Sequence, residues 1–525
     1  MSDGQASPQA SAPVDARPLV LLLGVVLAAL VHLAVGLLPF PEEVPPGPAR
    51  MAAAVTALTA TCWLGNGLPL GPASLLPLAL MPLLGALPIA SVAPSYAHPI
   101  LWLFFGGFVL AIGIERWGLH RRLALRIVAL VGLEPSRLVL GFMIAGAFLS
   151  MWMSNTATTL LLFPIARALV DSLVRARAVE GKGSEGFGFA LLLGIAYACS
   201  AGGIATPIGT APNALFLSFY GGYVAKGAPP IGFPQWMMLA LPVTLILVPV
   251  IWLYLTRVSC RVPRAHPAAR AILDEEIRAL PPLSSAEKRM AGLFALVALL
   301  WITRQDFRLG EAFFIPGWWR LLPVESAAAI GDGAVAVLVA ILAFLVPSGR
   351  RKGEALMDWD HARRMPWDIL FLLGGGVAIA RAFEDTGLSA AIGLGLKPAL
   401  ESMPPLAMIL MVCTLVTFLT EVTSNTAVIA LLLPVLAGAA AAANVDPRLL
   451  LVPATLSASC AFMLPIATPP NAIVYASGLV PMAKMARTGI WMNLIGIVVI
   501  TLVVWLVGTV VLGIDTGAMP DWGRG

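Results

Sequence analysis

The most informative shortage in this sequence is charge. Only 12% of its 525 residues are Asp, Glu, Lys or Arg, whereas 59% are hydrophobic, and apolar runs such as 19–38 and 491–512 contain no charged residue. This composition excludes an ordinary water-soluble domain and indicates an integral membrane protein. The apolar runs do not alternate with polar residues as barrel strands do, so we predict an all-α polytopic membrane protein.

Cysteine and histidine are also scarce. The five Cys form no CxxC pair, which argues against a disulfide framework or a metal site. The five His show no ligand spacing on a shared helix face, so no catalytic metal is expected, and no organic cofactor is predicted. No nucleophile–base pair is evident, and an enzyme is therefore not expected. The net charge of +5 comes from Lys and Arg clustered in short links, a topology signal rather than a nucleic-acid footprint.

Apolar length predicts about eleven transmembrane helices. We expect them near residues 19–39, 51–66, 70–90, 98–117, 189–220, 234–256, 288–303, 328–347, 366–382, 449–479 and 488–513. Residues 1–18, rich in Ala, Ser and Pro, are predicted to be a disordered tail before an uncleaved first helix.

Two further apolar regions, 138–174 and 404–443, are long for one crossing and short for two. Arg residues flank both ends of the first region, so both ends are predicted to be cytoplasmic. A segment that enters and leaves on one side, with the polar triplet Ser154-Asn155-Thr156 in its middle, is a re-entrant helical hairpin. The second region carries the same triplet at 424–426, and the charge count places its ends outside. The same count predicts a cytoplasmic N-terminus and an outside C-terminus.

An internal repeat supports this arrangement. Three blocks recur in the same order, and Gly107 matches Gly376 in the first of them. The blocks are "LFFGGFVLAIGIERWGL" at 103–119 with "FLLGGGVAIARAFEDTGL" at 371–388, "SNTATTLLLFP" with "SNTAVIALLLP", and "IGTAPNALF" at 208–216 with "IATPPNAIV" at 466–474. Together with the charge count, the repeat predicts two halves of inverted topology.

The third block breaks a membrane helix near its centre in each half, because Pro cannot continue the helix there. We expect the four second halves to begin at polar caps, namely Thr156 or Asn155, Thr210, Thr426 or Asn425, and Thr468. Four helix N-termini that converge near the membrane midplane favour an anion without any Arg or Lys.

The first halves end at the same places and expose carbonyl groups, which favour cations. Ser150 and Thr420 lie one helical turn before the two triplets and add a hydroxyl on the same face. Hydroxyl, amide and carbonyl oxygens without a carboxylate suit Na⁺ and carry too little charge for Ca²⁺ or Mg²⁺. The residues alone therefore suggest an anion held between two monovalent cations. For the intramembrane Glu421 we favour structural support or an aqueous-facing position, with proton coupling as the alternative, because its match is Met151.

The paired triplets, the Pro-Asn breaks and the run "LFFGGFVLAIGIERWGLHRR" resemble the divalent anion:sodium symporter (DASS) family, bacterial dicarboxylate transporters most closely, over about residues 95–485. The resemblance implies a homodimer in which a scaffold domain holds an elevator-like transport domain with both hairpins. The expected segments are scaffold 19–130 and 290–400, transport domain 131–256 and 401–525, and a cytoplasmic linker 257–289.

The resemblance also implies site residues. Its first Na⁺ site corresponds to Ser150, Ser154, Asn155 and Gly209, and its second to Thr420, Ser424, Asn425 and Ala467. The substrate carboxylates would meet Asn155, Thr156, Thr210, Asn425, Thr426, Thr468 and Pro469.

The resulting hypothesis is Na⁺-coupled symport of a small dianion, a C4-dicarboxylate such as succinate, malate or fumarate, across the bacterial inner membrane. The alternatives are a Na⁺-independent dicarboxylate exchanger, a proton-coupled carrier, a citrate or sulfate transporter and, from another class, a passive anion channel. A purely structural interpretation is that these Ser and Thr side chains hydrogen-bond their own backbone or hold helices together. The recurrence of the triplets and of the breaks in both halves argues against it.

Overall fold

The computed structural model describes residues 17–42, 44–132, 134–175, 182–260, 262, 275, 277–309, 313–325, 327–400 and 403–523. The predicted disordered tail therefore lies outside the described residues except for its last two positions. Much of the predicted linker 257–289 lies outside them as well.

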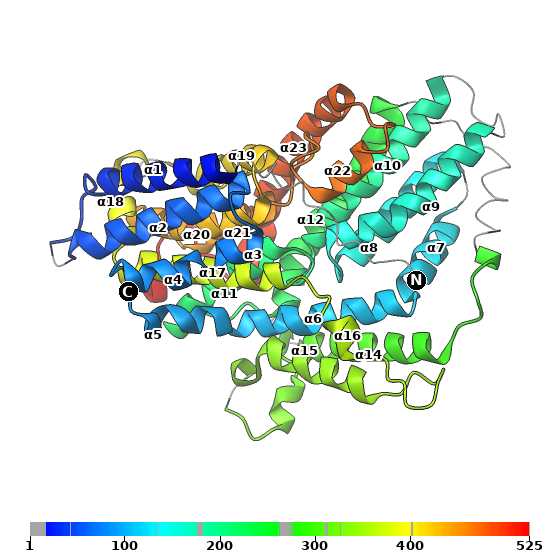
Figure 1. The fold of residues 1–525 in the computed structure, drawn as a ribbon, viewed down its shortest axis with the longest axis horizontal. Helices are drawn as coiled ribbons and strands as arrows, with labels where there is room; N and C mark the ends of the chain where they lie inside the picture. Colours follow the sequence, from blue (N-terminus) through cyan, green and yellow to red (C-terminus); the bar gives the residue numbers. More distant parts are fainter. Residues whose placement is uncertain are drawn as a thin grey trace.

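The described chain is almost entirely helical (Figure 1). Its first half contains α1 (Arg17–Val35), α2 (Pro46–Gly65), α3 (Leu70–Ser74), α4 (Leu76–Leu83), α5 (Ile89–Val92), α6 (Pro99–Arg116), α7 (Leu119–Val131), α8 (Pro135–Ser150), α9 (Asn155–Arg175), α10 (Lys182–Gly203), α11 (Ala211–Ala225) and α12 (Phe233–Leu253). Its second half contains α14 (Ser285–Ile302), α15 (Ala327–Leu345), α16 (Trp359–Ala362), α17 (Trp367–Asp385), α18 (Leu388–Leu400), α19 (Pro405–Val422), α20 (Asn425–Ala442), α21 (Arg448–Ser457), α22 (Pro469–Tyr475), α23 (Met482–Val503) and α24 (Thr509–Val511).

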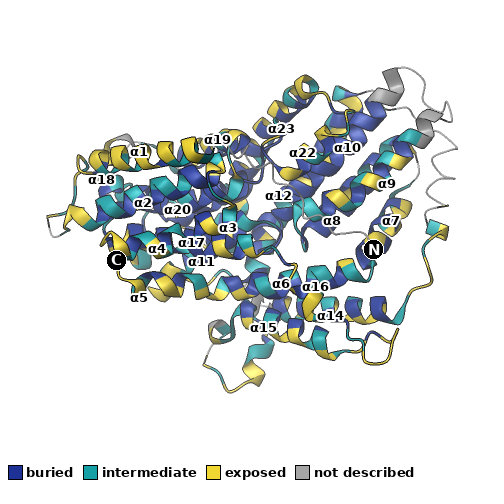
Figure 2. Cartoon of the chain, in the orientation of Figure 1, coloured by how far each residue is buried: buried dark blue, intermediate teal, exposed yellow. Residues whose placement is uncertain are grey.

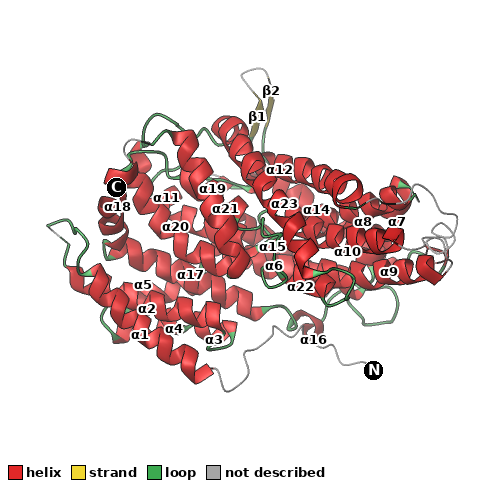
Figure 3. Cartoon of the chain, turned by 90° about the horizontal axis from the view of Figure 1, so that it is seen from above, coloured by secondary structure: helices red, strands yellow, loops and turns green. Residues whose placement is uncertain are grey.

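Between α14 and α15 the strands β1 (Phe307–Leu309) and β2 (Phe313–Ile315) form a short antiparallel pair that projects from one edge in the view from above (Figure 3). Short 3₁₀ turns occupy Ala93–Ala97, Trp318–Leu321 and Asp521–Gly523, and π-helical turns extend α12 and α23 at Tyr254–Ser259 and Val504–Gly508.

Seven helical segments in the described residues are long and apolar enough to cross a membrane. Four shorter apolar segments, Leu70–Leu83, Pro135–Ser150, Ala329–Leu345 and Arg448–Ser457, add to them. The multi-helical membrane protein that we predicted is therefore confirmed, while the total of about eleven crossings stays a prediction. Figure 2 shows the difference between a peripheral and a central helix: α1 is mostly exposed, whereas Gly186–Gly203 in α10 is buried throughout.

The order of elements from α6 to α12 recurs from α17 to α23. The junctions between α6 and α7 and between α17 and α18 have the same backbone, because Gly118 and Gly387 adopt φ values of +72° and +73°. Their N–H groups donate to the carbonyls of Glu115 and Glu384, both at 3.0 Å. Only glycine adopts this left-handed conformation without strain, which explains why the two matched positions carry it.

Matched helices make matched contacts, both within each repeat and between the two repeats. Helices α8 and α9 lie against α10, and α19 and α20 lie against α21. The second half of each broken helix packs on the hairpin of the other repeat, since α22 contacts α9 and α11 contacts α20. The first break, around Thr206, is buried in the bundle, whereas Ile466 in the second break is exposed.

Two further helices, α6 and α17, lie beside this group and pack against other parts of the chain, α6 on α15 and α17 on α3. The packing of α6 on α15 is close at Gly106, where an added Cβ would lie 2.5 Å from the backbone carbon of Ala336. Its neighbour Gly107 has more room, because the nearest atom to an added Cβ is the side-chain Cδ1 of Ile208 at 3.6 Å. Adjacent glycines therefore serve different contacts.

We predict that Gly106→Ala lowers the thermal stability of the purified protein whereas Gly107→Ala does not. The methyl group introduced by Gly106→Ala would collide with a helix backbone that cannot move aside, at a cost of about 1–3 kcal/mol, whereas Gly107 leaves an ordinary contact distance. The measurement is the midpoint of heat-induced loss of the monodisperse peak in detergent. Equal midpoints for the two variants would contradict the close packing of α6 on α15.

Candidate functional site

The two hairpin tips both place a serine directly before the second helix, but they differ in the length of the turn and in the hydrogen bonding of that serine. Helix α8 ends at Ser150 and α9 starts at Asn155, while α19 ends at Val422 and α20 starts at Asn425. The hydroxyl of Ser154 accepts a hydrogen bond from the N–H of Ala157 (3.2 Å), whereas Ser424 occupies the N-cap position of α20 without a side-chain cap hydrogen bond. The predicted caps at Asn155 or Thr156 and at Asn425 or Thr426 are therefore wrong by one or two residues. Serine takes the cap, and the asparagine side chain becomes free for other contacts.

The caps of the broken helices are confirmed. Thr210 precedes α11 with φ −147° and ψ 146°, and Thr468 precedes α22 with φ −141° and ψ 148°. The hydroxyl of Thr468 accepts from the N–H of Asn471 (3.4 Å). Proline lies in the first turn of both helices, where its missing N–H costs nothing.

The first predicted Na⁺ site is brought together by two glycines. The hydroxyl of Ser150 donates to Oδ1 of Asn155. A Cβ added at Gly209 would lie 2.9 Å from the carbonyl oxygen of Ser150, and one added at Gly203 would lie 2.5 Å from Oδ1 of Asn155. Carbonyl and amide oxygens from hairpin and break thus converge where no side chain fits. The binding of Na⁺ by these oxygens stays a prediction.

One residue that the sequence reasoning missed holds this group together. The hydroxyl of Thr206 donates to the backbone carbonyl of Met151 and accepts from the N–H of Gly209 (3.1 Å). Thr206 is fully buried and so links the hairpin turn to the break. The available signal was a hydroxyl residue directly before Pro207 inside the interrupted helix.

The second predicted Na⁺ site is connected differently. The hydroxyl of Thr420 donates to its own helix, to the carbonyls of Val416 and Thr417 at 3.0 Å each. Among the described residues, Oδ1 of Asn425 is buried without a hydrogen-bond partner. The N–H of Ala467 donates to the carbonyl of Leu464 (3.2 Å), which makes the same tight turn that Gly209 makes with Thr206.

Glu421 links the second hairpin to the second break. Its Oε1 accepts from the N–H groups of Phe462 (2.7 Å) and Met463 (2.8 Å), and its Oε2 accepts from that of Leu464 (3.0 Å). The side-chain amide of Asn493 also donates to Oε1 (2.7 Å). These contacts agree with the support role that we favoured, because the carboxylate satisfies backbone donors that no helix pairs.

The first half of the first broken helix contacts the second break. The hydroxyl of Tyr197 on α10 donates to the carbonyl of Phe462, which follows α21. Since α22 packs on α9 and α11 packs on α20, each helix that begins at predicted substrate residues of one repeat packs against such a helix of the other repeat. These residues are Asn155, Thr156, Thr210, Asn425, Thr426, Thr468 and Pro469.

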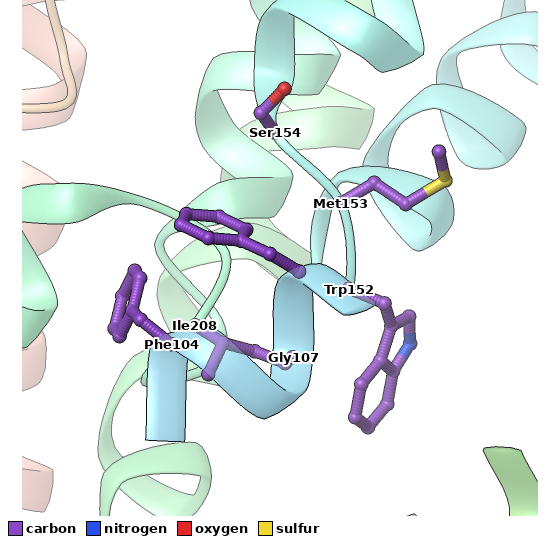
Figure 4. A pocket seen from close by; sticks show the side chains of 7 residues that line it. Phe104, Gly107, Trp152, Met153, Ser154 and Ile208 are labelled. Atoms are coloured by element: carbon purple, nitrogen blue, oxygen red, sulfur yellow. The ribbon is translucent and has the colours of Figure 1, made fainter. Parts of the chain in front are cut away.

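Two small cavities border this region, each beside one of the matched glycines. The first lies between α6 and the first hairpin tip, and Figure 4 shows Ser154 at the far end with its hydroxyl pointing away from the Phe104 and Trp152 rings. Its lining residues are Phe104, Gly107, Phe108, Trp152, Met153, Ser154 and Ile208. The second lies between α17, α11 and α20 and is lined by Leu215, Phe219, Gly376, Val377, Ala380, Ala430 and Leu433.

Comparison with known proteins covers nearly the whole chain. A family model described as "Sodium:sulfate symporter transmembrane region" matches residues 19–514. The chain is 38% identical over 466 residues to the sodium-dependent dicarboxylate transporter SdcS of Staphylococcus saprophyticus, covering 88% of this chain and 86% of the relative. It is 37% identical over 498 residues to SdcS of Staphylococcus aureus, covering 94% and 92%.

Two solved structures share the fold at low identity. Neisseria gonorrhoeae MtrF, whose structure is described in the context of antimetabolite efflux pumps, aligns with a TM-score of 0.58 and 13% identity over 93% of this chain and 96% of that one. The Alcanivorax borkumensis YdaH transporter aligns with a TM-score of 0.57 and 13% identity over 94% and 98%.

The described chain is a bundle of apolar helices with two polar-tipped hairpins and two broken helices, and its family and curated relatives place it in the transporter class. The chain belongs to the sodium:sulfate symporter family, which is the divalent anion:sodium symporter family that its motifs resemble.

We predict that Glu421→Gln lowers transport on the order of tenfold, because the introduced NH₂ group would replace an oxygen that accepts from backbone donors. The pH profile of the residual transport between about pH 6 and pH 8 should match that of the wild type, because a residue that only supports the backbone does not bind and release a coupled proton during transport. The measurement is initial uptake across this pH range.

The matched control is Met151→Leu. The hydrogen bond from Thr206 goes to the backbone carbonyl of Met151, which a change of side chain retains, so uptake should stay near the wild-type rate. Loss of a wild-type pH dependence in Glu421→Gln would instead favour proton coupling.

Proposed function

We propose that the protein is a secondary active transporter that imports a small divalent anion together with Na⁺ across the bacterial inner membrane. The proposed substrate is a C4-dicarboxylate such as succinate, malate or fumarate, in line with the sodium-dependent dicarboxylate transporters to which the chain is similar. We propose further that it works as a homodimer, with its N-terminus in the cytoplasm and its C-terminus outside. The observation that carries the proposal is the doubled group of a hairpin tip and a broken helix.

The chemistry of this group fits both ligands. The starts of α9, α11 and α20 present N–H groups to carboxylates, whereas α22 begins with Pro469 and Pro470 and offers the hydroxyl of Thr468 instead. None of these starts carries a basic side chain. The oxygens near Ser150, Asn155 and Gly209 suit a weakly charged cation. An anion bound between two cations makes each ligand raise the affinity for the other, which is the linkage that symport requires. A cycle with three or more Na⁺ per dianion would move positive charge inward and respond to membrane potential.

An elevator mechanism is supported by a difference between the matched repeats. Gly107 on α6 lies beside Ile208 at the first break. Its match Gly376 on α17 lies instead beside Leu215 and Ala430, which are five residues beyond Thr210 and Asn425, roughly 8 Å along their helices. If the two repeats were related by exact symmetry, Gly107 and Gly376 would contact matched residues. Rigid-body sliding of one domain past the other would displace one of these contacts along the helices and so produce the observed difference.

The exposure of matched isoleucines agrees with this interpretation. Ile208 is 8% exposed, whereas Ile466 is 76% exposed. We propose that α6 and α17 belong to the scaffold and that the hairpins, broken helices, α12 and α23 form the transport domain. Since α11 and α20 run from the site toward the outside in the predicted orientation, the described state is inward-facing in this proposal. Ile466 would reach α17 in the other state.

In proteoliposomes, we expect an inward Na⁺ gradient to drive labelled succinate above its equilibrium level, because symport couples the downhill entry of Na⁺ to the uphill entry of the substrate. Uptake that ignores Na⁺ but requires internal dicarboxylate would identify an exchanger. Uptake that never exceeds equilibrium under any gradient would identify a channel. Competition by citrate and by sulfate, each in excess over succinate, compares the remaining substrate classes.

The variants Asn155→Ala and Asn425→Ala test the site assignment. Each should lower the apparent Na⁺ affinity and the succinate affinity together, on the order of tenfold, because the two ligands are linked. The measurement is initial uptake as a function of Na⁺ at several succinate concentrations. Unchanged kinetics in both variants would sink the assignment of these residues.

Cysteine cross-linking tests the elevator. In a background without the five native cysteines, which are all buried, Val377→Cys should cross-link to Ala430→Cys because both line the second cavity. That cross-link should stop transport. By the match to Phe108 and Ile208, Val377→Cys should cross-link to Ile466→Cys in the other state, with a yield that Na⁺ and succinate change. Full transport by the 377–430 cross-linked protein would contradict sliding.

A further inference from the structure

Asn213 and Asn471 occupy matched positions directly after the two breaks, and no exposed surface remains on either residue. The side-chain amide of Asn213 donates to the carbonyls of Gly203 (3.1 Å), Ile204 (3.1 Å) and Thr206 (2.8 Å). That of Asn471 donates to the carbonyls of Ala461 and Leu464, both at 3.1 Å. In both repeats acceptors lie ten and seven residues before the asparagine.

The orientation of both amides follows from these contacts. Each NH₂ group faces two or three carbonyl oxygens, and an amide turned the other way would place oxygen against oxygen. In agreement with this orientation, Oδ1 of each asparagine is buried and has no hydrogen-bond partner among the described residues. Each asparagine therefore donates to carbonyls of its own break, which include Gly203 at the end of α10 in the first repeat and lie after the end of α21 in the second.

The carbonyls that receive these donors belong to the turns that carry the predicted cation ligands. The carbonyl of Thr206 accepts from both Asn213 and the N–H of Gly209 (3.4 Å). In the second repeat the carbonyl of Leu464 accepts from Asn471 and from the N–H of Ala467 (3.2 Å). In each repeat, one carbonyl thus accepts from both the asparagine and the residue three positions after the carbonyl itself. That residue is Gly209 or Ala467, whose own carbonyl is a predicted Na⁺ ligand.

We propose that Asn213 and Asn471 are positioning residues for the two cation sites, each holding the turn that presents the carbonyl of Gly209 or Ala467. This inference rests on the proposed Na⁺-coupled function. Neither asparagine touches the cation in this proposal. Each pins the shared carbonyl of Thr206 or Leu464 and so sets the angle at which the ligating carbonyl points, as outer partners do around other metal ions.

We call the asparagine that holds each turn the clamp, and there is a physical reason why this residue is an asparagine. The carbonyls at the end of a half-helix have no intrahelical donor, and in the membrane interior no water replaces it. A neutral donor satisfies them without placing a positive charge beside a cation site, as Lys or Arg would. Aspartate has the same shape but no donor, and its charge would repel the carbonyls.

The test compares Asn213→Ser and Asn471→Ser with Asn213→Asp and Asn471→Asp in proteoliposomes. We expect each serine variant to raise the Na⁺ concentration for half-maximal succinate uptake on the order of tenfold, because the turn loses its donor. Each aspartate variant loses the same donor but adds a negative charge beside the site, so its half-maximal Na⁺ concentration should also differ from that of the wild type. The succinate KM at saturating Na⁺ should stay within about twofold of the wild type, because the anion-binding helix starts are retained. Competition between Na⁺ and Li⁺ should also change, since discrimination between them depends on carbonyl geometry.

The matched control is Thr244→Val. Thr244 is 4% exposed, and its hydroxyl donates to the carbonyl of Ala201 (2.7 Å), near the same half-helix end but outside the turn. This variant loses one buried donor and should keep the wild-type Na⁺ dependence. Where a serine or aspartate variant is recovered only in aggregated form, the remaining variant at that position decides.

The outcomes separate the two proposals. Normal Na⁺ dependence in the wild type, with half-saturating Na⁺ and Li⁺ competition unchanged in all folded variants, would overturn the clamp alone. A fall in maximal rate with unchanged half-saturating Na⁺ would overturn it too, because that result indicates a structural role only. Wild-type uptake that ignores Na⁺ would overturn both the clamp and the proposed function.

Discussion

The structure depends on one constraint: a helix that breaks inside a membrane must satisfy its own backbone. Each break leaves carbonyls without donors on one side and N–H groups without acceptors on the other. In this protein the two sides are treated differently. The carbonyls accept hydrogen bonds from Asn213 and Asn471, whereas the starts of α11 and α20 have no side-chain cap on their N–H groups. In the transport proposal, these two uncapped starts are the ones that remain available to an anion.

The positions of the breaks and of the hairpin tips could be predicted because their signals are local. Each break combines Thr, Pro and Asn in an apolar run, and a polar triplet within a long apolar run has few other interpretations. Proline alone would not have been enough, since Pro164 and Pro434 lie inside α9 and α20. The cap residues were less predictable, since Ser, Asn and Thr all accept from the first turn. Sequence alone could not decide that Ser154 takes this role and leaves Asn155 to meet Ser150.

The contacts that join the site could not be predicted, because they connect segments far apart in the chain. Nothing in the sequence around Thr206 indicates that its hydroxyl reaches Met151, and nothing near Glu421 indicates the amides of 462–464. The difference between matched residues was equally hidden. Ile208 and Ile466 are the same residue in the same motif, yet one is covered by α6 and the other is exposed, since repeated sequence does not determine the conformational state.

The two repeats hold the hairpin to the break through groups of different charge. The first hairpin is tied to its break by a neutral hydroxyl and carbonyl, Thr206 and Met151, whereas the second is tied by the carboxylate of Glu421. The second predicted cation site begins at Thr420, next to that carboxylate, and the first has no acid at the matching place. A buried carboxylate attracts a cation far more strongly than it would in water, because little solvent screens it. The two sites therefore lie in different electric fields although their predicted ligands match, and equal Na⁺ affinities at the two sites are not to be expected.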